Sequence, residues 1–155
     1  MQRWRRVLVL IAEISALSAA SVHGTSPEDS KAAFARRQDT MKRMGRPLYL
    51  GIGRVVKGKA ADGPDTVAAA ETVAALAGAL DRTLFAPGSN VAESKIKPEI
   101  FAASDHVDQL IVAVQTAAGK LVPAIKTGDQ AEITSAYNAV ANACNDCHTA
   151  FRKEE

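Results

Sequence analysis

The sequence Cys144-Asn145-Asp146-Cys147-His148 lies near the end of the 155-residue chain and has the spacing C-x-x-C-H. This spacing is typical of the covalent attachment of a c-type haem. Two thiols add to the two vinyl groups of a haem, and the imidazole that follows binds the iron as its proximal ligand. In a helix, Cys144 shares one side with Cys147 and His148, three and four residues later. One helix face therefore carries the whole proximal half of a haem site.

A C-x-x-C pair has two other common uses. It forms a redox dithiol, usually beside a βαβ pattern, or half of a zinc site, which needs two further ligands. No strand pattern precedes Cys144, and the only other histidines in the chain are His23 and His106. Haem attachment is therefore the prediction, and a dithiol or a structural disulfide is the alternative.

The composition favours helices and excludes some functional classes. The chain is rich in alanine, and only 5% of its residues are aromatic, which suits close helix packing. Three arginines and one glutamate lie before residue 25, so 16 of the 19 basic and 16 of the 17 acidic residues follow. This balance argues against a nucleic-acid-binding protein, which would show a basic face. No paired carboxylates, nucleophile-base pair or phosphate loop stands out, so we expect no enzymatic activity.

The first 24 residues have the features of a signal peptide. Three arginines precede an apolar stretch over residues 7–20, which Glu13 interrupts. Cleavage is compatible with sites after Ala20 and after Gly24. A membrane anchor would need about 20 uninterrupted apolar residues, so we expect no membrane span once the signal is removed. The sequence thus predicts a signal peptide over residues 1–24 and one mature domain over residues 25–155.

The first helix is expected to begin at residues 26–29, Ser-Pro-Glu-Asp, because serine caps a helix and proline suits its first position. Pro47 predicts a kink or a local loosening of the helix between residues 43 and 50, since proline removes a backbone hydrogen bond. Lys57-Gly58-Lys59 is a plausible end. The apolar stripe comprises Phe34, Met41, Met44, Leu48, Ile52 and Val55.

Three further helices follow. The second starts at residues 63–65, with Leu80 and Leu84 on its apolar face. Residues 86–97 form a connection whose length is unusual in a compact bundle and often functional. The third helix runs from residue 98 to residue 128, and Asp129 caps the fourth.

The apolar stripe of the fourth helix includes both cysteines. Four amphipathic helices with one long and two short connections predict an all-α fold, an antiparallel up-down four-helix bundle. The cysteines would then point into the bundle, where a haem fills the interior. The stripe comprises Ile133, Tyr137, Val140, Cys144, Cys147 and Phe151.

Several stretches together resemble the class II c-type cytochromes, the family of cytochrome c′ and the low-spin cytochrome c-556. The similarity covers residues 27–153, and the C-terminal position of C-x-x-C-H is itself specific, because class I cytochromes place it near the N-terminus. The matching stretches are Arg37-Gln38-Asp39-Thr40-Met41, Met41-Lys42-Arg43-Met44-Gly45-Arg46, Val56-Lys57-Gly58, Lys97-Pro98-Glu99-Ile100-Phe101 and residues 144–153.

The resemblance implies one haem c, held by thioethers to Cys144 and Cys147 and by an iron bond to His148. It also places Met41 on the distal side of the haem, where the low-spin branch supplies a methionine sulfur as the sixth ligand. Without the resemblance, Met41 can also be interpreted as a core residue in the apolar stripe of the first helix. Met44, one turn later, is a competing ligand.

The resemblance further assigns residues to the edge of the haem. Arg37 and Gln38 match positions near the propionates, and Arg152 matches a basic residue near the proximal histidine. Ser89 falls in the loop that flanks the haem. Without the resemblance, the sequence is equally consistent with Arg37 and Gln38 lying on the solvent-exposed side of the first helix.

The predicted function depends on whether Met41 binds the iron. We expect it to ligate the iron, because Gly45-Arg46 after Met41-Lys42 resembles the low-spin branch. The result would be a periplasmic one-electron carrier with His/Met-ligated, low-spin iron and transient redox partner proteins. The alternative is a five-coordinate cytochrome c′ that binds nitric oxide or carbon monoxide at the distal face. The resemblance also leaves open a homodimer formed through the first two helices.

Overall fold

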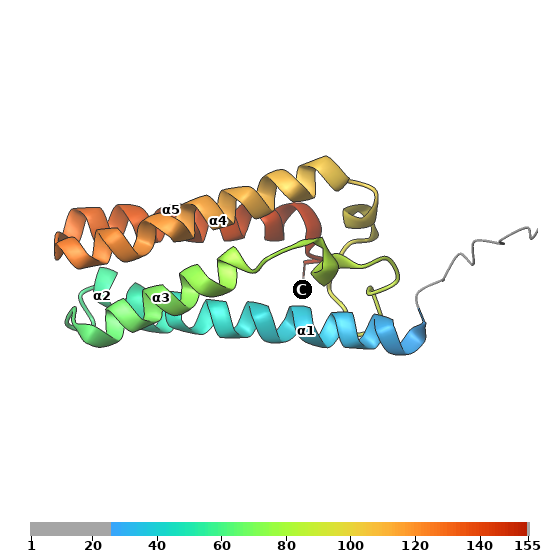
Figure 1. Ribbon diagram of the computed structural model, residues 1–155, viewed down its shortest axis with the longest axis horizontal. Coiled ribbons are helices and arrows are strands. Elements are labelled where there is room, and N and C mark those ends of the chain that lie inside the picture. Colours follow the sequence, from blue (N-terminus) through green and yellow to red (C-terminus); the bar gives the residue numbers. More distant parts are fainter. Residues whose placement is uncertain (1–25, 155) are drawn as a thin grey trace, which may run out of the picture.

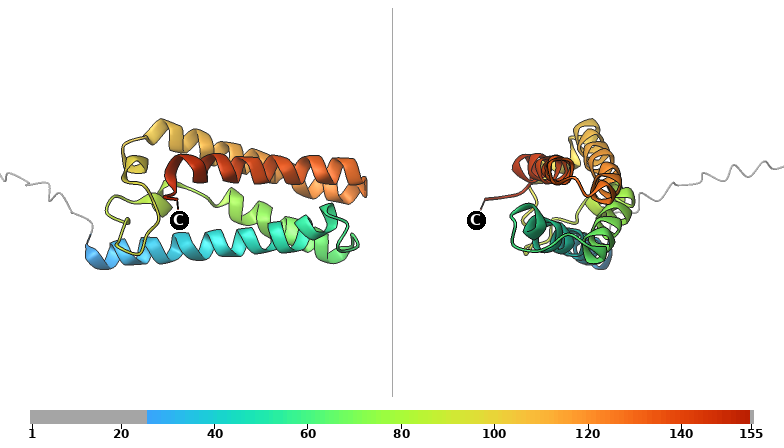
Figure 2. Two further views of the ribbon diagram at one scale, coloured as in Figure 1. Left: turned by 180° about the vertical axis from the view of Figure 1, so that it is seen from behind. Right: turned by 90° about the vertical axis from the view of Figure 1, so that its left-hand side faces the viewer.

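The bundle consists of four antiparallel rods (Figures 1 and 2). The structure is a computed structural model and describes residues 26–154. The first rod is α1 (Pro27–Arg46), continued by the π-helix η1 (Pro47–Ile52) and by α2 (Gly53–Val56). The others are α3 (Pro64–Gly78), α4 (Ser104–Thr127) and α5 (Gln130–Phe151). The predicted all-α, up-down four-helix bundle is therefore confirmed.

The first rod begins at the predicted residue, and its α-helical hydrogen bonding changes at Pro47, within the predicted range. Ser26 Oγ accepts a hydrogen bond from the Asp29 amide at 3.0 Å, which caps α1. Pro47 opens the π-helix, because it has no N–H to continue the α-helical bonding pattern. The Gly53 amide accordingly bonds the carbonyl of Leu48, five residues back. Gly58, with φ of 65°, then turns the chain out of the rod.

The connection between α3 and α4 is longer than predicted. The second helix was expected to reach Leu84, but α3 ends at Gly78. The Asp81 carboxylate accepts the Thr83 amide and so starts a separate 3₁₀ helix, η2 (Arg82–Phe85). The third helix was expected to start at Pro98. That proline instead starts another 3₁₀ helix, η3 (Pro98–Phe101), and α4 begins at Ser104.

The last two rods form a tight antiparallel pair. Gly128, with φ of 70°, ends α4, and Asp129 Oδ1 accepts the amides of Ala131 and Glu132 at 2.8 Å to start α5. Within the described chain, α4 is the one helix long and apolar enough to cross a membrane by length and composition. One face of it packs against α3 and α5.

Two apolar clusters hold the bundle together. The larger runs along the rods and includes the fully buried Leu48, Val73 and Leu121. The smaller joins the α3–α4 connection to α4 and α5, through Ile96, Ile100, Val107 and Phe151. This places the N-terminal part of α1, the end of α5 and the connection at one end of the bundle (Figure 1).

Candidate haem-binding site

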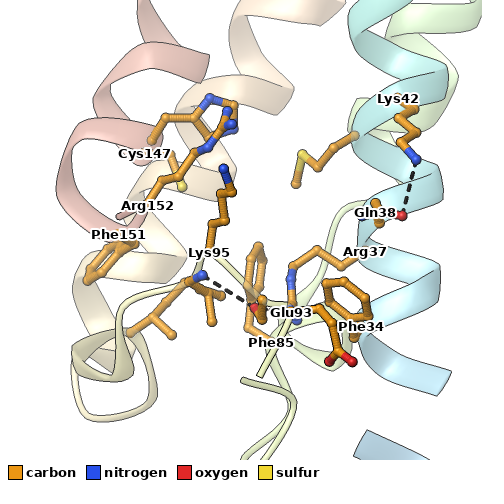
Figure 3. A pocket seen from close by; sticks show the side chains of 15 residues that line it. Phe34, Arg37, Gln38, Lys42, Phe85, Glu93, Lys95, Cys147, Phe151 and Arg152 are labelled. Atoms are coloured by element: carbon orange, nitrogen blue, oxygen red, sulfur yellow. Dashed lines mark hydrogen bonds between the residues drawn. The ribbon is translucent and has the colours of Figure 1, made fainter. Parts of the chain in front are cut away.

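The C-terminal turns of α5 face α1 across a cavity of about 440 Å³. Cys147 and His148 line it from α5, and Phe34 and Met41 line it from α1 (Figure 3). Its volume falls within the range of cofactor and ligand pockets. The α3–α4 connection contributes Phe85, Glu93, Ser94, Lys95 and Ile96 to its walls.

A second cavity of about 90 Å³ extends into the bundle. It is lined by Cys144, and its wall is almost entirely apolar, with Met44, Leu110 and Val114 among its residues. Both cavities share the side chains of Met41, Phe85, Cys147 and His148. The two cysteines and the histidine of C-x-x-C-H therefore border one elongated space between α1 and α5.

The chemical state of these groups suits a covalently bound haem. Cys144 and Cys147 are free, half-buried thiols, and burial raises the pKa of both. His148 is exposed at the cavity, and desolvation together with the charge of Arg152 lowers its pKa. This shift favours the neutral imidazole, which is the form that binds iron. These residues fit a flat apolar ring that is fastened through sulfur and bound through nitrogen.

Met41 lies on the opposite wall from His148. It is half-buried and borders both cavities, whereas Met44 is buried and borders only the inner one. Of the two methionines weighed from the sequence, Met41 is thus the one that faces the imidazole side across the main cavity.

Arg37 is buried, which excludes the interpretation of this residue as a solvated helix edge. Only 7% of its surface is exposed, and burial lowers its pKa. The guanidinium donates to the Leu84 carbonyl at 2.7 Å, to Ser89 Oγ and the Ser89 carbonyl at 2.9 Å, and to Ser94 Oγ at 3.1 Å. It also lies over the Phe34 ring, 5.8 Å from its centroid.

The remaining predicted residues divide between the cavity and its surroundings. Gln38 and Arg152 are exposed and line the main cavity, and Gln38 Oε1 accepts a hydrogen bond from Lys42 Nζ at 3.1 Å. Ser89 is fully buried behind Arg37 and is not among the residues that line either cavity. Its connection to the site is through its hydrogen bonds with Arg37.

Sequence reasoning missed the contribution of Phe85 and Lys95. Phe85 lines both cavities, and the side chain of Lys95 rises from the connection into the main one (Figure 3). The unusual length of this connection was the available signal, but a loop carries no periodicity from which a side-chain direction follows.

The described residues give no support to a zinc site. Among residues 26–154, no three His, Cys, Asp or Glu side chains form a group that could hold a metal ion. Haem attachment, by contrast, needs only the two thiols and one imidazole that are present.

Comparisons with known proteins point to one family. The sequence model of the family described as cytochrome C′ matches residues 32–152. Cytochrome c′ of Rhodocyclus tenuis is 30% identical over 95 residues, which cover 59% of this chain and 71% of that protein. Cytochrome c′ of Pararhodospirillum photometricum is 25% identical over 117 residues, which cover 76% of this chain and 93% of the relative.

Solved structures agree with the sequence comparisons. Cytochrome c′ from Thermochromatium tepidum aligns with a TM-score of 0.74 and 28% identity, covering 81% of this chain and 97% of the other. Two variants of cytochrome c′ from Alcaligenes xylosoxidans cover the same shares at the same identity. One is ferrous with bound nitric oxide (TM-score 0.72), and the other has bound carbon monoxide (TM-score 0.71).

These comparisons overturn the expected His/Met-ligated, low-spin electron carrier. The matching family model is described as cytochrome C′, three curated relatives are named cytochrome c′ and one cytochrome c-554, and solved neighbours hold nitric oxide or carbon monoxide. A gas needs the iron position that a Met41 sulfur would occupy, so the five-coordinate alternative is the better account. The transient redox partners expected for a carrier stay a prediction.

Proposed function

The chain belongs to the cytochrome c′ family, and from this premise we propose that it binds nitric oxide or carbon monoxide at the distal face of one covalently attached haem c. The observation that carries the proposal is the cavity between α5, with Cys147 and His148, and α1, with Phe34 and Met41. We propose binding only, with no catalysed reaction.

The residues of α5 would hold the cofactor. Cys144 and Cys147 would form the thioethers, and the neutral imidazole of His148 would bind the iron from the proximal side. When bound, the haem would supply the iron to which a diatomic gas binds. Met41 and Phe34 would face the distal side of the iron without binding it and would exclude water from that side.

Polar residues would receive the two propionates at the cavity mouth. Gln38, Lys42, Lys95 and Arg152 all line the main cavity, and all are exposed. Cations at this position would offset the carboxylate charge, and their exposure would keep the propionates in water. Arg37 also lines the main cavity, and Ser89 would support this edge from behind it, through the hydrogen bonds between the two residues.

Titration of the matured, reduced protein with carbon monoxide and with nitric oxide tests the proposal. We expect each gas to shift the haem absorption spectrum, with one molecule bound per haem. A spectrum that neither gas changes would contradict gas binding. Replacing both cysteines, Cys144→Ala with Cys147→Ala, should abolish covalent haem in the denatured protein and serves as the control.

We also propose that the protein is exported to the periplasm. The signal peptide over residues 1–24 lies outside the described residues, so this proposal stands on the basic and apolar pattern of the sequence. N-terminal sequencing of the matured protein tests it. A start at Ser21 or Thr25 is expected, and a chain that retains Met1 would contradict export.

We propose, finally, that the protein forms a homodimer. One solved cytochrome c′ with 26% identity is described as having an unusual ligand-controlled dimer dissociation. In this chain Tyr49 and Leu50, in the first rod, are large exposed apolar residues, with 44% and 66% of their surfaces exposed. Sedimentation of wild type and Leu50→Glu tests the proposal: wild type should be dimeric and the variant monomeric, whereas a monomeric wild type would contradict it.

A further inference from the structure

Residues 84–97, which we call the strap, connect the two walls of the cavity. The strap begins with the last two residues of η2 and passes across the end of the bundle, between α1 and the C-terminus of α5 (Figures 1 and 3). It is fixed at both sides by hydrogen bonds, and these differ in kind. On the α5 side two join backbone groups and two are donated by the Lys97 ammonium to the Thr149 and Ala150 carbonyls, whereas on the α1 side all four come from one side chain.

The α5 side of the strap is held as a short extended pairing. The Lys97 amide donates to the Phe151 carbonyl at 2.8 Å, and the Lys153 amide donates to the Lys95 carbonyl at 2.7 Å. Ile96 and Arg152 accordingly form an antiparallel bridge. Most substitutions of side chains would leave these backbone bonds in place.

The α1 side depends on Arg37. Its two terminal nitrogens carry four of the five guanidinium N–H groups, and these meet four acceptors in the strap, at Leu84, Ser89 and Ser94. The acceptors lie 47 to 57 residues further along the chain. Because Arg37 is buried, the loss of these bonds would leave polar groups without partners.

The anchored segment carries cavity-lining residues. Leu84, whose carbonyl Arg37 binds, directly precedes Phe85, and Phe85 lines both cavities. Ser94, whose hydroxyl Arg37 binds, directly precedes Lys95 and Ile96, which line the main cavity. Displacement of the strap from α1 would therefore move a ring and two further side chains at the site.

We propose that Arg37 is a positioning residue for gas binding: it fastens the strap to α1, and so holds Phe85 in place and keeps the walls formed by α1 and α5 at a fixed separation. The part of this inference that concerns gas rests on the proposed function, whereas the fastening of the strap does not. Arg37 has this effect through its hydrogen bonds to other protein groups, which accept from its terminal N–H donors.

The substitution Arg37→Lys gives a sharp test. Lysine keeps the positive charge but has one nitrogen, which cannot span acceptors that two separate guanidinium nitrogens reach. Arg43→Lys is the matched control. Arg43 is in the same helix, but it is exposed and pairs only with the exposed Asp39 at 3.5 Å.

Two measurements on the matured protein report the effect. The first is hydrogen exchange at the amides of Ser89 and Ser94, which bond the Ala86 and Val91 carbonyls within the strap. We expect exchange to be roughly tenfold faster in Arg37→Lys, since a charged, buried hydrogen-bond set is lost. The second is the rate of carbon monoxide association, which should rise severalfold as Phe85 is released. Arg43→Lys should match wild type in both.

Each of the other possible outcomes tests one part of the proposal. Unchanged exchange in Arg37→Lys would overturn the anchoring of the strap. Faster exchange with an unchanged association rate would overturn the link to gas binding. If wild type binds no carbon monoxide, the proposed function fails. The hydrogen-exchange rates would still test whether Arg37 anchors the strap to α1. If Arg37→Lys does not accumulate, Ser94→Ala removes one acceptor, and both rates should rise less but in the same direction.

Discussion

At the scale of single residues, Gly53 is a point of close contact between the first rod and α5. A Cβ atom at this position would lie 2.9 Å from Tyr137 Oη and 3.3 Å from the Leu48 carbonyl oxygen. The Tyr137 ring also meets the Tyr49 ring edge-on, with centroids 6.4 Å apart, and Tyr49 lines the inner cavity. Close packing at Gly53 thus supports the inner end of the haem site.

We predict that Gly53→Ala destabilises the protein by about 1–3 kcal/mol, because the added methyl group overpacks a buried contact. Gly119→Ala is the control. It lies on the exposed face of α4, where a Cβ would meet nothing within 4 Å, so alanine should stabilise the helix by roughly 0.5–1 kcal/mol. Denaturant unfolding of the two variants measures both values. Equal stabilities would contradict the packing at Gly53.

Single residues also show which features of the site could be predicted from the sequence and which could not. C-x-x-C-H identifies three neighbouring residues whose common face follows from helix geometry alone, and the structure places all three beside a cavity. Arg37 is different, because its four acceptors lie 47 to 57 residues away. Neither helix periodicity nor capping rules report such distant contacts, so whether it was buried or solvated was left undecided.

At the scale of elements, the short helix η2 decides where Phe85 lies. The Asp81 carboxylate accepts hydrogen bonds from the amide and the hydroxyl of Thr83 and so begins η2. These bonds lower the pKa of Asp81. Since Phe85 is the last residue of η2, the cap is part of what directs the phenyl ring to the cavity.

We predict that Asp81 contributes a small, pH-dependent share of stability. A carboxyl whose pKa is lower in the folded state stabilises the fold above its unfolded pKa of about 3.9. That contribution is lost as the pH falls through the lower, folded value. Unfolding free energies of wild type and Asp81→Asn should therefore differ at pH 7 and converge at acidic pH. The effect is small because Asp81 is exposed.

Thr83→Val supplies the control for this mechanism. It removes the hydroxyl but keeps the amide bond to Asp81, so it should reduce the dependence on pH without abolishing it. A difference between wild type and Asp81→Asn that is the same at pH 7 and pH 3 would contradict the role of the charge.

Element boundaries were predictable where local chemistry sets them. Ser26, Pro47, Gly58 and Asp129 each act on their own neighbours, and at each of them a helix begins, changes its hydrogen bonding or ends as expected. The end of α3 was predicted too late, because the apolar spacing continues through Leu80 and Leu84 although the backbone has left the helix. Both leucines are buried by tertiary packing that periodicity cannot distinguish from a helix face.

At the scale of the whole molecule, the bundle was predictable and the state of the iron was not. Amphipathic repeats and short connections specify four antiparallel rods. Ligation by Met41, however, depends on the distance between α1 and α5, which the packing of the whole bundle and the strap set. The resemblance of Gly45-Arg46, after Met41-Lys42, to the low-spin branch favoured the wrong branch, because a local stretch of sequence carries no information on that distance.

The electron paramagnetic resonance spectrum of the matured, ferric protein tests the open iron position most directly. With His148 as the one protein ligand to the iron, we predict a high-spin signal that is unchanged in Met41→Leu. A low-spin signal in the wild type that becomes high-spin in Met41→Leu would show a sulfur bond to the iron and would contradict the account.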